Sequence, residues 1–188
     1  MNRVVPPGQF NALTHPFRRS VFRLETLQVY RGSGEDDWIR LFEAGADSPP
    51  ADPEQDAWEA LIREHRDAGR TIQRVHVVVE PLSDYLRFEV AWQYALSVAA
   101  GEGISLVAVS GNDWPHGIPR RDFWLYDDRD LPYALYSPDG TWQGVMPVDD
   151  ETAVTTARRW RDAALAHAQP WHEFVASRPD LAARVPAR

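Results

Sequence analysis

The chain has 188 residues and a net charge of −8. This length fits one domain over residues 1–188, with a loose arm at 1–8 and a frayed tail at 179–188. Because cysteine is absent, disulfides, thiolate catalysis and Cys-ligated metals are excluded. The negative charge argues against direct nucleic-acid binding. Without a signal-peptide core or an apolar run of membrane length, we expect a cytoplasmic protein with no membrane partner.

The first half of the chain predicts three elements. Residues 20–28 alternate in part and carry β-branched and aromatic side chains, which favours a strand, with a helix as the alternative. A short helix follows Gly34 and ends near Ala44. A second helix begins after Asp52, which is a preferred N-cap residue, and ends at Gly69.

The middle of the chain predicts a β-α-β unit. The segment 71–80 alternates around its valines and ends at Pro81. Ser83 can cap the helix that follows, and Gly101 or Gly103 ends that helix. The segment 104–110 is continuously apolar, as expected of a strand covered on both faces.

The second half predicts an antiparallel meander and two helices. A loop over 111–119 leads to three short strands, with a turn signal at 137–140 between the last two. The strands are expected at 121–128, 131–137 and 141–148, and the helices at 149–168 and 171–177. The fold class is therefore α/β (α+β): a mixed sheet with one parallel β-α-β unit, an antiparallel meander, and helices packed on the sheet.

One candidate site lies on the polar face of the segment 71–80. Arg74, His76 and Glu80 share that face. At 100° per residue, Glu89 falls into the apolar stripe of the following helix, which we expect at Tyr85, Trp92 and Leu96. A lone buried carboxylate is costly, so Glu89 should be either protonated or paired, and Arg74 or His76 on the neighbouring strand could pair with it. The cluster is then either an internal ion pair, which is the simpler interpretation, or a functional site. As a site, it would supply a general acid or base, or a clamp for an anionic or amide ligand, with Tyr85 as a further candidate ligand-binding residue.

A second candidate alternates along DFWLYDD. Asp122, Trp124, Tyr126 and Asp128 share one face of that predicted strand. Carboxylates gathered there could hold Mg²⁺ or Ca²⁺. The spacing matches no metal-binding loop, and acidic strand ends are commonly solvated. We therefore expect no metal and no cofactor, and keep Asp122 and Trp124 as candidate ligand-binding residues.

Several segments together resemble an uncharacterised actinobacterial family, the domain-of-unknown-function family numbered six-eight-seven-nine. They are QRVHVVVEPLSDYLRFEVAWQY, SVAAGEGI, DFWLYDD, YSPDG, VFRLET and RDAALAHAQP. The resemblance implies a small stand-alone cytoplasmic protein, often encoded near helix-turn-helix regulators, and implies no catalytic residue. Gly103 stands where the family usually has a carboxylate, and the 111–119 loop has its own composition.

These observations lead to two functional hypotheses. The first is a non-catalytic accessory or regulatory protein that binds a partner protein, for example a neighbouring regulator, because the chain is acidic, has eight tryptophans and has no catalytic motif. The second is a small-ligand-binding protein or enzyme with its site at the carboxyl ends of strands 71–80 and 104–110, beside the 111–119 loop. The oligomeric state is not predicted.

Overall fold

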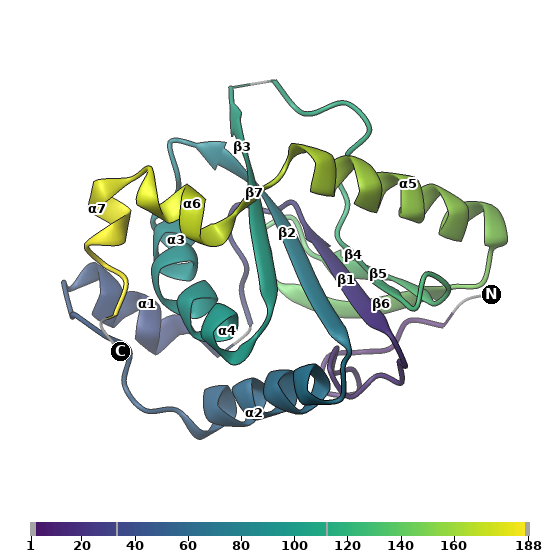
Figure 1. Ribbon diagram of the computed structural model, residues 1–188, viewed down its shortest axis with the longest axis horizontal. Coiled ribbons are helices and arrows are strands. Elements are labelled where there is room, and N and C mark those ends of the chain that lie inside the picture. The colour runs from purple at the N-terminus through teal and green to yellow at the C-terminus, as the bar shows by residue number, and fades with distance from the viewer. Residues whose placement is uncertain (1–2, 33, 112, 187–188) are drawn as a thin grey trace.

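The computed structural model describes residues 3–32, 34–111 and 113–186. These residues form a seven-stranded sheet in the order β6-β5-β4-β1-β2-β3-β7 (Figure 1). Strands β1, β2 and β3 are parallel, whereas β4, β5, β6 and β7 pair antiparallel with their neighbours. The predicted mixed sheet is therefore confirmed. The strands are β1 Ser20–Glu25, β2 Thr71–Glu80, β3 Gly103–Ser110, β4 Phe123–Tyr126, β5 Leu131–Tyr136, β6 Trp142–Val148 and β7 Gln169–Pro170.

The helices begin at the capping residues that the sequence indicates. Asp52 accepts a hydrogen bond from the Glu54 amide, and Ser83 accepts one from the Leu86 amide. Gly101 follows the last turn of α4 with a positive φ of 121°. The helices are α1 Asp36–Glu43, α2 Pro53–Asp67, α3 Asp84–Phe88, the π-helical turn η1 Glu89–Gln93, α4 Tyr94–Ala100, α5 Glu151–His167, α6 Trp171–Ala176 and α7 Pro179–Ala182.

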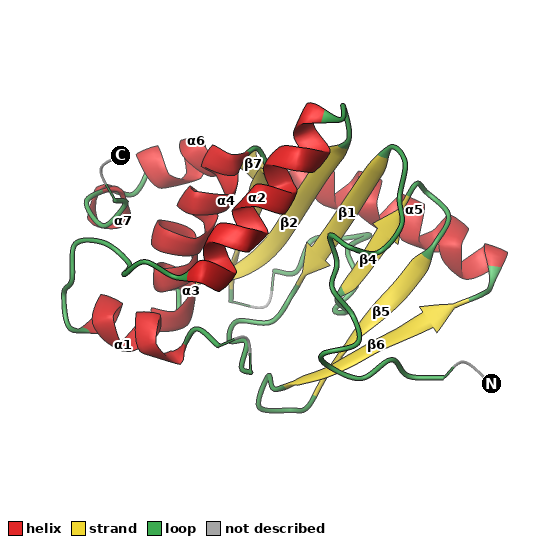
Figure 2. Cartoon of the chain, turned by 90° about the horizontal axis from the view of Figure 1, so that it is seen from below, coloured by secondary structure: helices red, strands yellow, loops and turns green. Residues whose placement is uncertain are grey.

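The two faces of the sheet are covered by different helices. Val75 and Val77 of β2 pack with residues of α5 on one face, whereas Val78 packs with α3 and η1 on the other. Figure 2 shows α5 behind the strands and α2 in front of them. The predicted alternation of β2 is thus confirmed. The apolar segment β3 is covered on both faces only in part, because Ala108 is exposed.

The pairing of β1 with β2 gathers charged residues on one face of the sheet. In the parallel register Arg23 lies beside Arg74, and Glu25 lies beside His76. Side chains of residues paired in this way point to the same face. The strand alternative for residues 20–28 is confirmed, although β1 ends at Glu25. The next amide, of Thr26, donates to the Asp122 carboxylate instead of to a neighbouring strand.

Both terminal segments contact the rest of the protein more than a loose arm and a frayed tail would. The amide and carbonyl of Val5 form hydrogen bonds of 2.8 and 2.9 Å with Val145. Leu181 of α7 is buried, and the Trp92 indole donates to the Arg184 carbonyl at 3.1 Å. Apolar side chains and backbone groups of both segments therefore find partners in the rest of the described chain. Residues 1–2 and 187–188 lie outside the described part of the chain.

None of the helices in the described ranges combines the length and the apolar character needed to cross a membrane.

Candidate functional site

A pocket of about 720 Å³ lies against the charged face of the sheet. Arg23 and Glu25 of β1 and Arg74 of β2 line it from the sheet. The helix that follows β2 contributes Tyr85 and Glu89, and further wall residues come from α2 and from the meander, among them Trp58, Trp124, Tyr136 and Trp142. The pocket thus joins an aromatic wall to a group of buried charges.

Glu25 is the centre of the buried charge network. Its carboxylate lies 2.7 Å from Nη2 of Arg23 and 3.4 Å from Nη1 of Arg74, and it accepts a 2.9 Å hydrogen bond from the Tyr94 hydroxyl. The Glu25 side chain is 1% exposed. Burial alone would raise the pKa of Glu25, but Arg23, Arg74, His76 and the Tyr94 hydrogen bond together lower it to about 2.

Arg74 is held by two carboxylates. Its Nε and Nη2 donate to the two oxygens of Glu102 at 2.8 and 3.4 Å, in a fork arrangement, while Nη1 faces Glu25. Burial would lower the pKa of Arg74, but Glu102 and Glu25 raise it well above its ordinary value. Its guanidinium hydrogen bonds are therefore directed to the protein rather than to the pocket.

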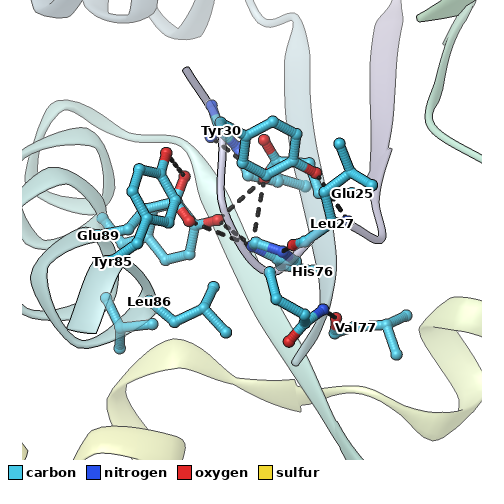
Figure 3. A network of polar contacts seen from close by, with 12 residues as sticks. Glu25, Leu27, Tyr30, His76, Val77, Tyr85, Leu86 and Glu89 are labelled. Atoms are coloured by element: carbon cyan, nitrogen blue, oxygen red, sulfur yellow. Dashed lines mark hydrogen bonds and ion pairs between the residues drawn. The ribbon is translucent and has the colours of Figure 1, made fainter. Parts of the chain in front are cut away.

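The hydrogen bonds of His76 fix its protonation state (Figure 3). Nε2 lies 2.7 Å from the Leu27 carbonyl, which can only accept, so Nε2 carries a proton. Nδ1 lies 2.7 Å from the Tyr94 hydroxyl, whose single proton goes to Glu25. Nδ1 must then donate as well, so we assign an imidazolium. Burial lowers the pKa of His76, but its contact with the charged Glu89 and the charge of Glu25 raise it overall.

Glu89 is the least satisfied carboxylate in this network. Its Oε2 lies 3.4 Å from Nδ1 of His76 and forms no hydrogen bond, and its Oε1 lies 3.4 Å from the Tyr85 hydroxyl. Charge-assisted hydrogen bonds are usually about 2.7–2.9 Å long. The side chain is nevertheless only 6% exposed. The predicted pairing of Glu89 with His76 is confirmed, and it is a loose contact.

A π-helical turn brings Glu89 and Tyr94 to the same histidine. The Tyr94 amide donates to the Glu89 carbonyl, five residues earlier. In an α-helix, side chains five residues apart would diverge by about 140°; the wider turn reduces that angle. Trp92 consequently points away and packs edge-on against Phe42, with ring centroids 5.3 Å apart. The prediction that Glu89 lies in a buried stripe with Tyr85 and Trp92 is confirmed, because all three are buried and Leu96 packs against the same cluster.

Asp122 supports the segment that leads into the pocket. Its carboxylate accepts hydrogen bonds from the amide and hydroxyl of Thr26 at 2.8 and 2.6 Å and from the hydroxyl of Tyr30 at 2.6 Å. Burial raises the pKa of Asp122, although these hydrogen bonds oppose the rise. Asp122 therefore lies behind the pocket and orients Tyr30, which lines it.

Trp124 forms part of the aromatic wall. The Arg23 guanidinium lies 4.8 Å from the centroid of the Trp124 ring, within cation–π range. Trp142 packs edge-on against Trp124, with 5.9 Å between ring centroids, and its ring is tilted against that of Tyr136 at 5.2 Å. Tyr126, on the same face, is buried in the core, where its hydroxyl donates to the Ala12 carbonyl.

Two predicted features lie outside the pocket. Glu80 forms an ion pair with Arg178 and is not a lining residue, because the pocket opens beside the middle of β2 rather than its carboxyl end. The second hypothesis placed the ligand site beside the 111–119 loop, but none of the described residues of that loop lines the pocket. Asn112 is outside the described residues. Asp128 pairs with Arg161 of α5, whereas Asp122 binds Thr26, so the two carboxylates have different partners.

The sequence analysis did not identify four residues of the charge network: Arg23, Glu25, Tyr94 and Glu102. A signal for the first two exists, because charges at positions i and i+2 of an otherwise apolar strand must share a face. Glu102 follows the helix-ending Gly101 and is the carboxylate that reaches Arg74. Gly103 pairs with Gln73 in the sheet and does not line the pocket.

A metal ion could be held by one group of described residues. Ligand atoms of Glu25, His76 and Glu89 all lie within 4.8 Å of one another. Glu25 is already neutralised by two guanidinium groups, and Nδ1 of His76 already bonds Tyr94. A cation there would have to displace these contacts, so the arrangement favours internal ion pairs.

Comparison with known proteins places the chain in a family. No curated protein matches it. The model of a family described as "Domain of unknown function (DUF6879)" matches residues 8–176. This range contains every residue of the pocket and of the buried network except Pro7. The chain belongs to the DUF6879 family.

Proposed function

We propose that this protein binds a small organic ligand in the pocket above the buried charge network. The single observation that carries the proposal is the pocket itself, whose volume of about 720 Å³ falls within the range of small-molecule sites. Aromatic side chains and a few buried polar groups, the usual components of such sites, line it. The proposal concerns binding and assigns no reaction.

Rigid positioning of the lining supports this proposal. Glu25 and Arg74 are buried and multiply bonded, and Tyr94 is 1% exposed. Side chains fixed in this way lose little conformational freedom when a ligand arrives, which favours binding. The π-helical turn is a further argument, because such turns occur frequently at functional sites.

The partner-protein hypothesis stays a prediction, together with the cytoplasmic location. One argument for that hypothesis was the number of tryptophans. All eight are buried or half-buried, in the core or around the pocket. The aromatic count is thus explained without a partner surface. If a neighbouring regulator does bind, hydrogen-exchange mapping of the mixture should protect one continuous surface patch.

A matched pair of variants tests the ligand proposal. Ala57 and Ala60 are both exposed on α2, but only Ala57 lines the pocket. Both should tolerate tryptophan at a similar cost in helix propensity. In a thermal-shift screen of small fragments, we expect hits on the wild type and on Ala60→Trp that are weakened in Ala57→Trp. A screen without hits, or hits unaffected by Ala57→Trp, would contradict the proposal.

A further inference from the structure

We infer that the pocket selects a cationic ligand, namely a flat, ring-bearing molecule with an amidinium or ammonium group that donates to Glu89. This inference rests on the proposed function and specifies its ligand class. It follows from the hydrogen-bonding state of the charged residues that line the pocket.

The lining carries more negative than positive charge. Among the described residues, five acids and three arginines line the pocket, the acids being Glu25, Glu35, Asp52, Glu54 and Glu89. Each of the three arginines has a partner, although Nε of Arg23 forms no hydrogen bond. Arg74 is bound by Glu102 and Glu25, Arg23 by Glu25, and Nε of Arg31 donates to the Asp139 carbonyl at 3.2 Å. An anionic ligand would have to compete with the carboxylates of Glu25 and Glu102 for the guanidinium groups of Arg23 and Arg74.

Glu89 instead has capacity left for a donor. Its side chain is only 6% exposed, its Oε2 forms no hydrogen bond, and both of its polar contacts are 3.4 Å long. The Tyr85 hydroxyl beside it also lies 3.4 Å from Glu35, so its one proton is shared between two carboxylates. An N–H donor with a positive charge would relieve this shortage, because charge-assisted hydrogen bonds are the strong ones.

The aromatic wall suits the rest of such a molecule. Arg23 already combines a cation–π contact with an ion pair, since its guanidinium lies over the Trp124 ring and pairs with Glu25. A planar cation that places its charge at Glu89 and its ring among Tyr30, Trp38 and Tyr85 would repeat that combination on the other side of the pocket. The lining thus matches a cation with an apolar body.

Three isosteric probes test the inference by calorimetry at physiological salt: benzamidine, benzamide and benzoate, which are cationic, neutral and anionic. We expect benzamidine to bind at least about tenfold more tightly than benzamide, and benzoate to bind most weakly. Glu89→Gln should lower benzamidine affinity by about tenfold or more and leave benzamide affinity nearly unchanged. Glu43→Gln, which removes an exposed acid outside the pocket, should change neither.

Each other result has a defined meaning. If benzamide or benzoate binds as well as benzamidine, the cation preference is refuted while the pocket remains a ligand site. If no probe and no fragment binds, the proposed function itself fails. Tight binding of Mn²⁺ or Zn²⁺ that Glu89→Gln abolishes would also refute the inference, because it would assign Glu25, His76 and Glu89 to a metal.

Discussion

Replacing Glu25 with glutamine should destabilise the protein strongly, because two buried guanidinium groups lose their shared anion. The Glu25 carboxylate contacts Arg23 at 2.7 Å and Arg74 at 3.4 Å. Its pKa falls from 4.5 to about 2 on folding. Each pKa unit corresponds to about 1.4 kcal/mol, so the charge contributes about 3 kcal/mol above pH 4.5. Breaking buried ion pairs in other proteins costs about 3–5 kcal/mol.

Equilibrium unfolding in urea measures this effect. At about pH 7 the free energy of unfolding of Glu25→Gln should lie about 3 kcal/mol below that of the wild type. Because the folded pKa is lower than the unfolded one, the contribution is lost as the pH falls from 4.5 towards about 2. The difference between the two proteins should therefore shrink by about 1 kcal/mol at about pH 3.5.

The control for this experiment is Glu43→Gln, which changes the same charge at an exposed position. It should alter stability by no more than about 0.5 kcal/mol. A loss below about 1 kcal/mol for Glu25→Gln, or a difference that does not narrow in acid, would refute the reasoning. It would mean that the desolvation of Glu25, Arg23 and Arg74 cancels their attraction.

Two further variants test the charge of His76 inside the buried network and the role of Glu80 outside it. The pKa of His76 is raised on folding, so its stabilising charge is complete below the unfolded value of 6.5 and is lost as the pH rises through the folded pKa. The stability of the wild type relative to His76→Gln should fall with rising pH, and an NMR titration that finds a His76 pKa below 6.5 would contradict the imidazolium assignment. Glu80→Gln removes only the partly exposed ion pair with Arg178, so it should lower the free energy of unfolding by less than about 1 kcal/mol. Fragment binding should be unchanged. Weakened binding would show that Glu80 belongs to the ligand site.

Much of the scaffold could be predicted because its signals are local. The valines of β2 alternate, Ser83 caps the next helix, and the turn at 137–140 is closed by a hydrogen bond from the Gly140 amide to the Ser137 carbonyl. Each of these depends on residues a few positions apart. Periodicity and capping rules apply directly to such patterns.

The site was predicted only in part because its composition depends on non-local pairing. Arg74, Tyr85, Glu89 and Trp124 do line the pocket, and His76 lies beneath them. The partner that organises them, Glu25, is on β1, and its position beside His76 follows from a strand order that the sequence does not display. The π-helical turn is equally hidden, since one extra residue per turn alters every angle calculated at 100° per residue.

The indole resonances of the eight tryptophans offer the most direct test of the central claim that the pocket above Glu25 and Glu89 is a ligand site. Four tryptophans line it and four pack elsewhere: Trp38, Trp58, Trp124 and Trp142 against Trp92, Trp114, Trp160 and Trp171. In a titration with benzamidine followed by ¹H–¹⁵N NMR, we predict saturable shifts confined to the first four indoles. Shifts spread evenly over all eight, or confined to the second four, would contradict the account.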